Sequence, residues 1–161
     1  MGFSIQIDGM EELVQKMGKL TEQAAGVAAK ALYDGAGIVA DAVSKEMQGI
    51  RTEPFKYAAG GKRRDPSPEE KALVLSAKHG VAKFRKNGIS VQTSVGLQNA
   101  GYGTLNGKTK PIPQIANAIN SGTSFMKGQP FMRAAFSQSQ SAATAAIEAG
   151  IQKYAEEMDL D

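Results

Sequence analysis

Residues 121–136 read SGTSFMKGQPFMRAAF and combine a helix stop, a tight loop and a helix start. Gly122 follows the partly apolar segment 112–119, where the end of a helix needs a residue able to take a positive φ. Pro130 suits the first turn of a second helix, because the N–H that proline lacks would have no partner there. Residues 121–136 therefore predict a rigid corner between two helices, with Gly128 relieving the backbone of the loop. We call this stretch the corner.

The side chains of the corner indicate packing or protein contact rather than chemistry. Its large side chains are the aromatic, thioether and guanidinium groups of Phe125, Met126, Phe131, Met132 and Arg133, and none of these five is a usual nucleophile, general base or metal ligand. The corner is therefore a candidate interface with another protein subunit. Its candidate contact residues are Phe125, Met126, Gln129, Pro130, Phe131 and Arg133.

A small antiparallel sheet is predicted from two parts of the chain. Apolar and polar residues alternate over residues 3–8, which is the pattern of a half-buried strand. Asn87 and Gly88 are a strong turn signal, and they predict a hairpin with arms at 81–85 and 89–95. The residues expected to share one face of the second arm are Val91, Thr93 and Val95.

Helices are predicted after Thr21, after Ser67 and from Phe131 onward. The first is long and has an Ala-rich apolar face, the second begins with Pro68, and the third carries an apolar stripe at steps of four or seven residues. Three glycines in the first helix each lower its propensity by about 1 kcal/mol relative to Ala. Either packing holds this helix, or it kinks near residues 34–37.

These elements predict an α+β fold, in which a small antiparallel sheet packs against a long N-terminal helix and a C-terminal helix. A length of 161 residues suits a single domain over residues 1–161. Residues 51–68 and 97–110 are rich in turn-forming residues and are expected to be long loops or arms.

The basic charge of the chain is concentrated in its middle. Residues 51–64 carry a net charge of +4 and residues 79–110 carry +5, whereas residues 1–50 carry −3. Such asymmetry favours an oriented surface that faces an anionic partner. For residues 51–64 three readings stay open: an arm that orders against a neighbouring subunit, a contact with DNA, and plain disorder. The residues of this candidate basic arm are Arg51, Phe55, Lys56, Tyr57, Lys62, Arg63 and Arg64.

Several function classes find no support in the sequence. The chain has no cysteine and one histidine, His79, and no paired carboxylates stand in an apolar setting, so we expect neither an enzyme nor a metal site. Gly107, Lys108 and Thr109 imitate the end of a phosphate-binding loop, but the earlier glycine that the motif requires is Tyr102, so no cofactor is expected. No stretch reaches the roughly 18 apolar residues of a membrane span, and no membrane contact is expected.

The corner also carries a resemblance to a known family. Its G-T-S-x-M-x-G-Q-P-F-M-R-A-A-F, at 122–136, resembles the C-terminal signature of the small neck or tail-completion proteins of tailed bacteriophages. That family is named after gene product ten of phage HK-ninety-seven. The opening FSIQIDGMEELVQKMGKL, at 3–20, resembles the start of the same family, a short strand followed by D-G-hydrophobic-E-E-L.

The resemblance implies a structural virion protein located in the neck or tail and assembled in the cytoplasm of the bacterial host. It implies a homo-oligomeric ring, a hexamer or dodecamer, between the head connector or adaptor and the tail terminator or tail-tube proteins. Basic loops in the lumen of such a ring would make non-specific contact with DNA. Two alternatives stay open: a tail terminator or other minor tail protein, and a small basic nucleic-acid-binding protein.

Overall fold

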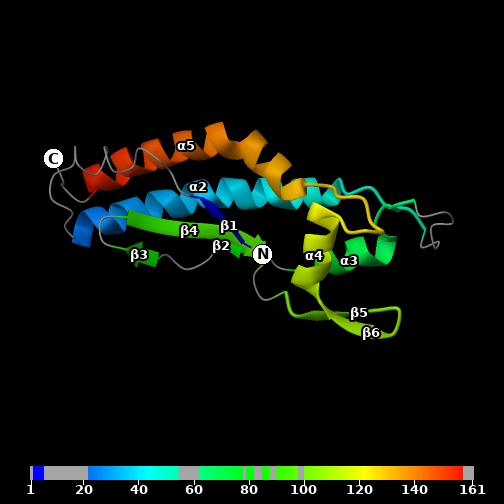
Figure 1. Cartoon of the computed structure of the whole chain (residues 1–161). Helices are drawn as coiled ribbons and strands as arrows, with labels where there is room; N and C mark the ends of the chain where they lie inside the picture. The colour runs from blue at the N-terminus through cyan, green and yellow to red at the C-terminus, as the bar shows by residue number, and fades with distance from the viewer. Residues whose placement is uncertain are drawn as a thin grey trace. The chain divides into compact units, whose positions relative to one another are not determined.

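The computed structural model describes residues 2–5, 22–54, 62–77, 79–81, 85–87, 90–97 and 100–157. Helices and short antiparallel strands are mixed along the chain, so the predicted α+β fold class is confirmed (Figure 1). In chain order the elements are β1 (Gly2–Ile5), α2 (Glu22–Gln48), α3 (Pro68–Ser76), β2 (His79–Val81), β3 (Arg85–Asn87), β4 (Ser90–Leu97), β5 (Tyr102–Leu105), β6 (Lys108–Pro111), α4 (Ile112–Ser121) and α5 (Phe131–Glu157).

The chain folds into two compact units, each of which draws on separate parts of the sequence. The first unit comprises the described residues of 41–80 and 97–138, and the second comprises those of 2–40, 81–96 and 139–161. Two of the boundaries fall inside the long helices α2 and α5, and the other two fall inside the strands β2 and β4. The expectation of one domain over residues 1–161 stays a prediction.

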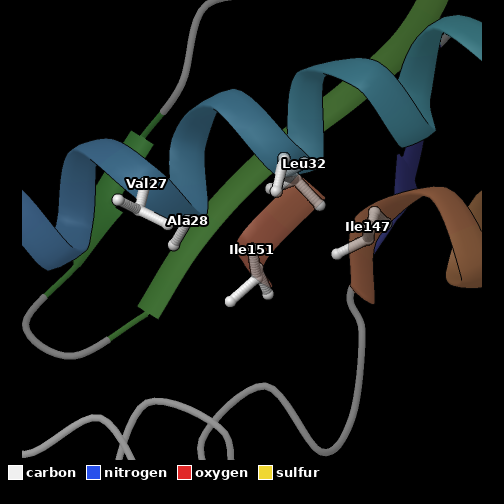
Figure 2. Packing of buried hydrophobic residues seen from close by; sticks show 6 residues of the cluster. Val27, Ala28, Leu32, Ile147 and Ile151 are labelled. Atoms are coloured by element: carbon white, nitrogen blue, oxygen red, sulfur yellow. The ribbon is translucent and has the colours of Figure 1, made fainter. Parts of the chain in front are cut away.

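The core of the second unit lies between the N-terminal part of α2 and the C-terminal part of α5. Its buried cluster (Figure 2) consists of Val27, Ala28, Ala31, Leu32, Ile147 and Ile151. The helices approach most closely at glycines: a Cβ on Gly35 would overlap the side chain of Ile147, and one on Gly150 would lie 3.1 Å from the Ala31 Cβ. Packing against α5 thus accounts for Gly35 in α2, which is continuous from Glu22 to Gln48.

β4 is the central strand of a sheet that also holds β1, β2 and β3, and its pairs with β1 and β3 are antiparallel. β1 and β2 pair with opposite edges of β4, and β3 pairs with β4 as well. Thr93 and Val95 are buried, which confirms that they share the inward face of this strand.

The predicted hairpin with arms at 81–85 and 89–95 is wrong in its first arm, because residues 85–87 form β3 and residues 79–81 form the separate strand β2. Asn87 lies opposite Ser90 in the ladder as the last residue of β3, so it does not stand in the turn as predicted; Gly88 and Ile89 lie outside the described residues. The eight-residue β4 also pairs with β1 and is held in place by its buried face.

In the first unit, residues 102–111 form a second hairpin where we expected a flexible loop. β5 and β6 pair antiparallel, with Leu105 opposite Lys108. Asn106 and Gly107 between them have φ of 51° and 71°, the left-handed pair that a two-residue hairpin turn requires. The loop prediction for 97–110 is therefore wrong over these strands.

The new hairpin is held by α3, because Leu105 is buried and a Cβ on Gly103 would lie 2.6 Å from Leu73 Cδ2. β6 leads directly into α4, which packs against α3. The buried residues of α4 are Ile112, Ile115, Ala116 and Ile119. In the first unit, the hairpin and α4 thus both pack against α3, and α4 leads into the corner.

Candidate protein-interaction site

The corner begins at a glycine that no other residue could replace without strain. Gly122 ends α4 with φ 80° and ψ 170°, a region that is essentially restricted to glycine. A Cβ on Gly122 would lie 2.8 Å from the Gly128 nitrogen, so the loop closes tightly on the helix end. The Gln129 N–H then donates to the Ile119 carbonyl at 2.7 Å. The predicted positive φ at Gly122 is confirmed.

The start of α5 is tied back to α4 by a side chain. Asn120 Oδ1 accepts a hydrogen bond of 3.1 Å from the Met132 N–H, which is one of the orphan donors in the first turn of α5. Pro130 stands one residue before the helix, and its carbonyl accepts the Ala134 N–H at 3.1 Å. Pro130 therefore occupies the cap position rather than the predicted first turn. The hydrogen bond from the Met132 N–H to Asn120 was not predicted from the sequence.

Residues 62–66, which we call the strap, run parallel to the loop of the corner. The Arg64 N–H donates to the Phe125 carbonyl at 2.9 Å, and the Lys127 N–H donates to the Arg64 carbonyl at 2.8 Å. Arg64 and Met126 thereby form a parallel β-bridge. The backbone on both sides of Met126 is fixed by a segment about 60 residues earlier in the sequence.

The Arg64 side chain anchors the strap to α3 by a buried ion pair. Its two terminal nitrogens donate to the Glu70 carboxylate at 2.7 and 2.8 Å. Glu70 also accepts from the Ser67 N–H, and the Ser67 hydroxyl accepts from the Glu70 N–H, so the pair is part of the capping box of α3. Burial opposes ionisation of Glu70, but the hydrogen bonds from Arg64 and Ser67 outweigh it and lower the pKa of Glu70.

This ion pair corrects the assignment of Arg64 to an exposed basic arm. The residue is 8% exposed, and its hydrogen bond to Glu70 raises its pKa. The capping box was readable from the sequence, since S-P-E-E at 67–70 fits its pattern. Nothing in the local pattern indicated that a cation is the second partner of Glu70.

A primary amide joins the corner to the segment after α2. Gln129 Oε1 accepts from the Arg51 N–H at 2.9 Å, and Gln129 Nε2 donates to the Arg51 carbonyl at 3.0 Å. The side chain thus pairs with Arg51 as a strand neighbour would. Next to this amide lies an open cavity of about 250 Å³.

The structure divides the predicted interface residues into two groups. Met126 and Phe131 are 2% and 4% exposed and contribute to the core of the first unit. Phe125, Pro130 and Arg133 are exposed, and Gln129 is half-buried in its contact with Arg51. The corner therefore has a packed inner side and an accessible outer side.

The predicted basic arm is divided as well. Lys62 and Arg63 are exposed next to the corner, and Arg51 is exposed beside Gln129. Phe55, Lys56 and Tyr57 lie outside the described residues. The exposed described cations in or beside the corner therefore include Lys62, Arg63, Lys127, Arg133 and Arg51, whereas Arg64 is buried.

Neither metal ligation nor membrane insertion is indicated by the part of the chain that the structure describes. Within it, no group of three or more His, Asp or Glu side chains could hold a metal ion. Of the helices searched over the same residues, none has the length and apolar character needed to cross a membrane. Comparison of the chain with protein-family models, curated proteins and solved structures gives no match.

Proposed function

We propose that this chain is a structural neck or tail-completion protein of a tailed bacteriophage, which assembles into a ring between the head connector and the tail. The observation that carries the proposal is the corner, where the residues of the family-like signature form a tethered turn with an exposed aromatic side chain. Phe125 is 59% exposed on this turn. The α+β fold and the short N-terminal strand agree with what the resemblance implies.

The tethering of the corner suits a protein that acts by assembly. Asn120, Gln129 and the backbone of Arg64 each fix a different part of the corner by hydrogen bonds. A surface that is already ordered loses little conformational entropy when a partner binds, so more of the contact energy appears as affinity. A ring repeats one heterologous interface, which needs two different surfaces in a fixed relation.

The position of the protein in the particle can be tested by deleting its gene from the phage that carries it. Electron microscopy of the resulting particles should reveal full heads beside free, finished tails, because a joining component is missing. Tails of abnormal length would instead indicate a tail terminator or other minor tail protein. Ordinary joined particles would overturn the proposal.

A nucleic-acid-binding role is the second candidate, and the exposed Lys62 and Arg63 favour it. Phosphate contacts make affinity fall steeply with salt, by a slope of about 0.9 per neutralised phosphate on a logarithmic plot. If this role is correct, the affinity of the purified chain for duplex DNA falls with salt concentration in this way. Replacing Lys62 and Arg63 by Gln should then make the salt dependence less steep. Binding that does not depend on salt would exclude this candidate.

A further inference from the structure

The exposed Phe125 side chain is displayed by a backbone that is held in place. Its carbonyl accepts the Arg64 N–H, the next residue, Met126, is buried, and the Met126 N–H donates to Thr123 Oγ1 at 3.1 Å. A large apolar side chain that is 59% exposed on such a turn loses apolar hydration whenever a partner covers it. Aromatic residues of this kind are enriched in the cores of protein interfaces.

The open cavity beside Gln129 has the size and lining to receive such a side chain. It measures about 250 Å³, and its apolar lining includes Ile50, Pro130, Phe131 and Ala134. A cavity of about 150 Å³ is large enough for benzene. Phe125 is not part of the lining, although Gly128 and Gln129 of the same corner are. The aromatic side chain and the cavity are thus two separate features of one unit.

The charges around the two features are complementary in part. Two exposed cations are close to Phe125 along the paired backbones: Lys127 lies two residues after it in the corner, and Arg63 precedes Arg64, whose N–H bonds the Phe125 carbonyl. The rim of the cavity carries the partly exposed carboxylate of Glu46 from α2, together with Arg51 on the Gln129 side. An incoming Phe125 would bring Lys127 and Arg63 toward Glu46.

We propose that Phe125 of one copy inserts into the cavity between Ile50 and Ala134 of a second copy of this chain. Each copy carries both features, so the contact can repeat from copy to copy in a head-to-tail manner. The inference deepens the proposed function, since it names the contact through which a ring would be built, and it is tested on the purified chain without reference to phage particles.

Two variants remove the two sides of the contact separately. Phe125→Ala removes the inserted side chain, and Ala134→Leu fills the cavity. Tyr102→Ala and Ala142→Leu are the matched controls: Tyr102 is another exposed aromatic of the first unit, and Ala142 is an exposed alanine of α5. Circular dichroism and urea unfolding of all four verify that they fold.

Sedimentation velocity over a concentration series measures self-association. We expect the full chain to associate and both test variants to weaken the association about 30-fold, as for the truncation of a central interface residue. The controls should associate as the unmodified chain does. Association that the two test variants leave unchanged, or a chain that stays monomeric up to about 1 mM, would overturn the inference.

Mixing the two variants tests the head-to-tail arrangement itself. Phe125→Ala retains the cavity and Ala134→Leu retains Phe125, so an equimolar mixture should form a one-to-one pair that cannot grow further. A mixture with no more association than either variant alone would contradict the proposed arrangement. If the contact is confirmed but gene deletion leaves ordinary joined particles, the proposed function fails and this inference stands. If gene deletion yields separate heads and tails but the two test variants associate as the unmodified chain does, this inference fails and the proposed function stands.

Discussion

In the corner, the side-chain amide of Gln129 pairs with a backbone segment as a neighbouring strand would. Gln129 donates to and accepts from the backbone of Arg51, which lies 78 residues earlier. A hydrogen bond of this kind contributes roughly 0.5–1.5 kcal/mol net. Glutamine suits the position because its amide supplies a donor and an acceptor on adjacent atoms in one plane. A glutamate would face the Arg51 carbonyl with a second acceptor.

We expect Gln129→Ala to lower the free energy of unfolding by about 1–2 kcal/mol, because both hydrogen bonds to Arg51 are lost. Gln140→Ala is the control, since Gln140 is an exposed glutamine inside α5. Urea unfolding followed by circular dichroism measures the difference. Equal midpoints for the two variants would mean that the amide does not hold the corner.

In the second unit, the effect of a glycine on helix packing depends on its position in α2. Gly35 and Gly37 are two residues apart in α2, and they differ in their surroundings. A Cβ on Gly35 would overlap Ile147 and approach the Ala143 carbonyl oxygen to 3.0 Å, whereas a Cβ on Gly37 would meet nothing within 4 Å. One glycine permits the approach of α5, and the other only lowers helix propensity.

The two glycines therefore predict opposite effects of the same substitution. Gly37→Ala should raise the free energy of unfolding by about 0.4–1 kcal/mol, since alanine restricts the unfolded chain and favours the helix. Gly35→Ala should lower it by about 1–3 kcal/mol, because the added methyl overpacks the contact with Ile147. Thermal unfolding of the two variants side by side measures both signs, and a stabilising Gly35→Ala would contradict this account of how the helices pack.

Glu70 takes part both in the N-terminal cap of α3 and in the ion pair with Arg64, and this gives the stability of the chain a pH dependence. The folded-state pKa of Glu70 is lowered, so the unfolded chain binds more protons between that value and the ordinary value of about 4.3. The stabilisation from the Glu70 carboxylate is therefore complete above about pH 4.3 and is lost as the pH falls through the lowered pKa.

Glu70→Gln should reduce the free energy of unfolding at pH 7 by about 3 kcal/mol, because it removes the carboxylate that the buried Arg64 side chain contacts through two hydrogen bonds. The same variant should flatten the loss of stability below about pH 4.3, since the titrating group is gone. Glu69→Gln is the control, because Glu69 is the exposed neighbour in the same helical turn. Urea midpoints across the acid range provide the measurement, and parallel pH profiles for Glu70→Gln and the unmodified chain would contradict the assignment.

At the scale of the whole molecule, short-range patterns predicted the elements well, and long-range pairings escaped prediction. Ser67 and Gly122 lie at the helix boundaries where the sequence placed them, because a cap and a positive φ are local requirements. The β5–β6 hairpin was missed although Asn106 and Gly107 are a strong turn signal, since the surrounding glycines resembled a loop. The partners of Asn120 and Arg64 could not be predicted, because their contacts join segments that no sequence period connects.

The basic residues at 62–64 likewise differ in their surroundings, since two are exposed and one is in a buried ion pair. Lys62 and Arg63 are exposed, whereas Arg64 is buried against Glu70. Replacing Lys62 and Arg63 together by Gln should change the free energy of unfolding by no more than about 0.5 kcal/mol, as for other exposed positions. Arg64→Gln should lower it by about 3 kcal/mol, because the Glu70 carboxylate is left buried and uncompensated. Urea unfolding at pH 7 compares the two, and an Arg64→Gln chain as stable as the double variant would mean that the ion pair does not anchor the strap to α3.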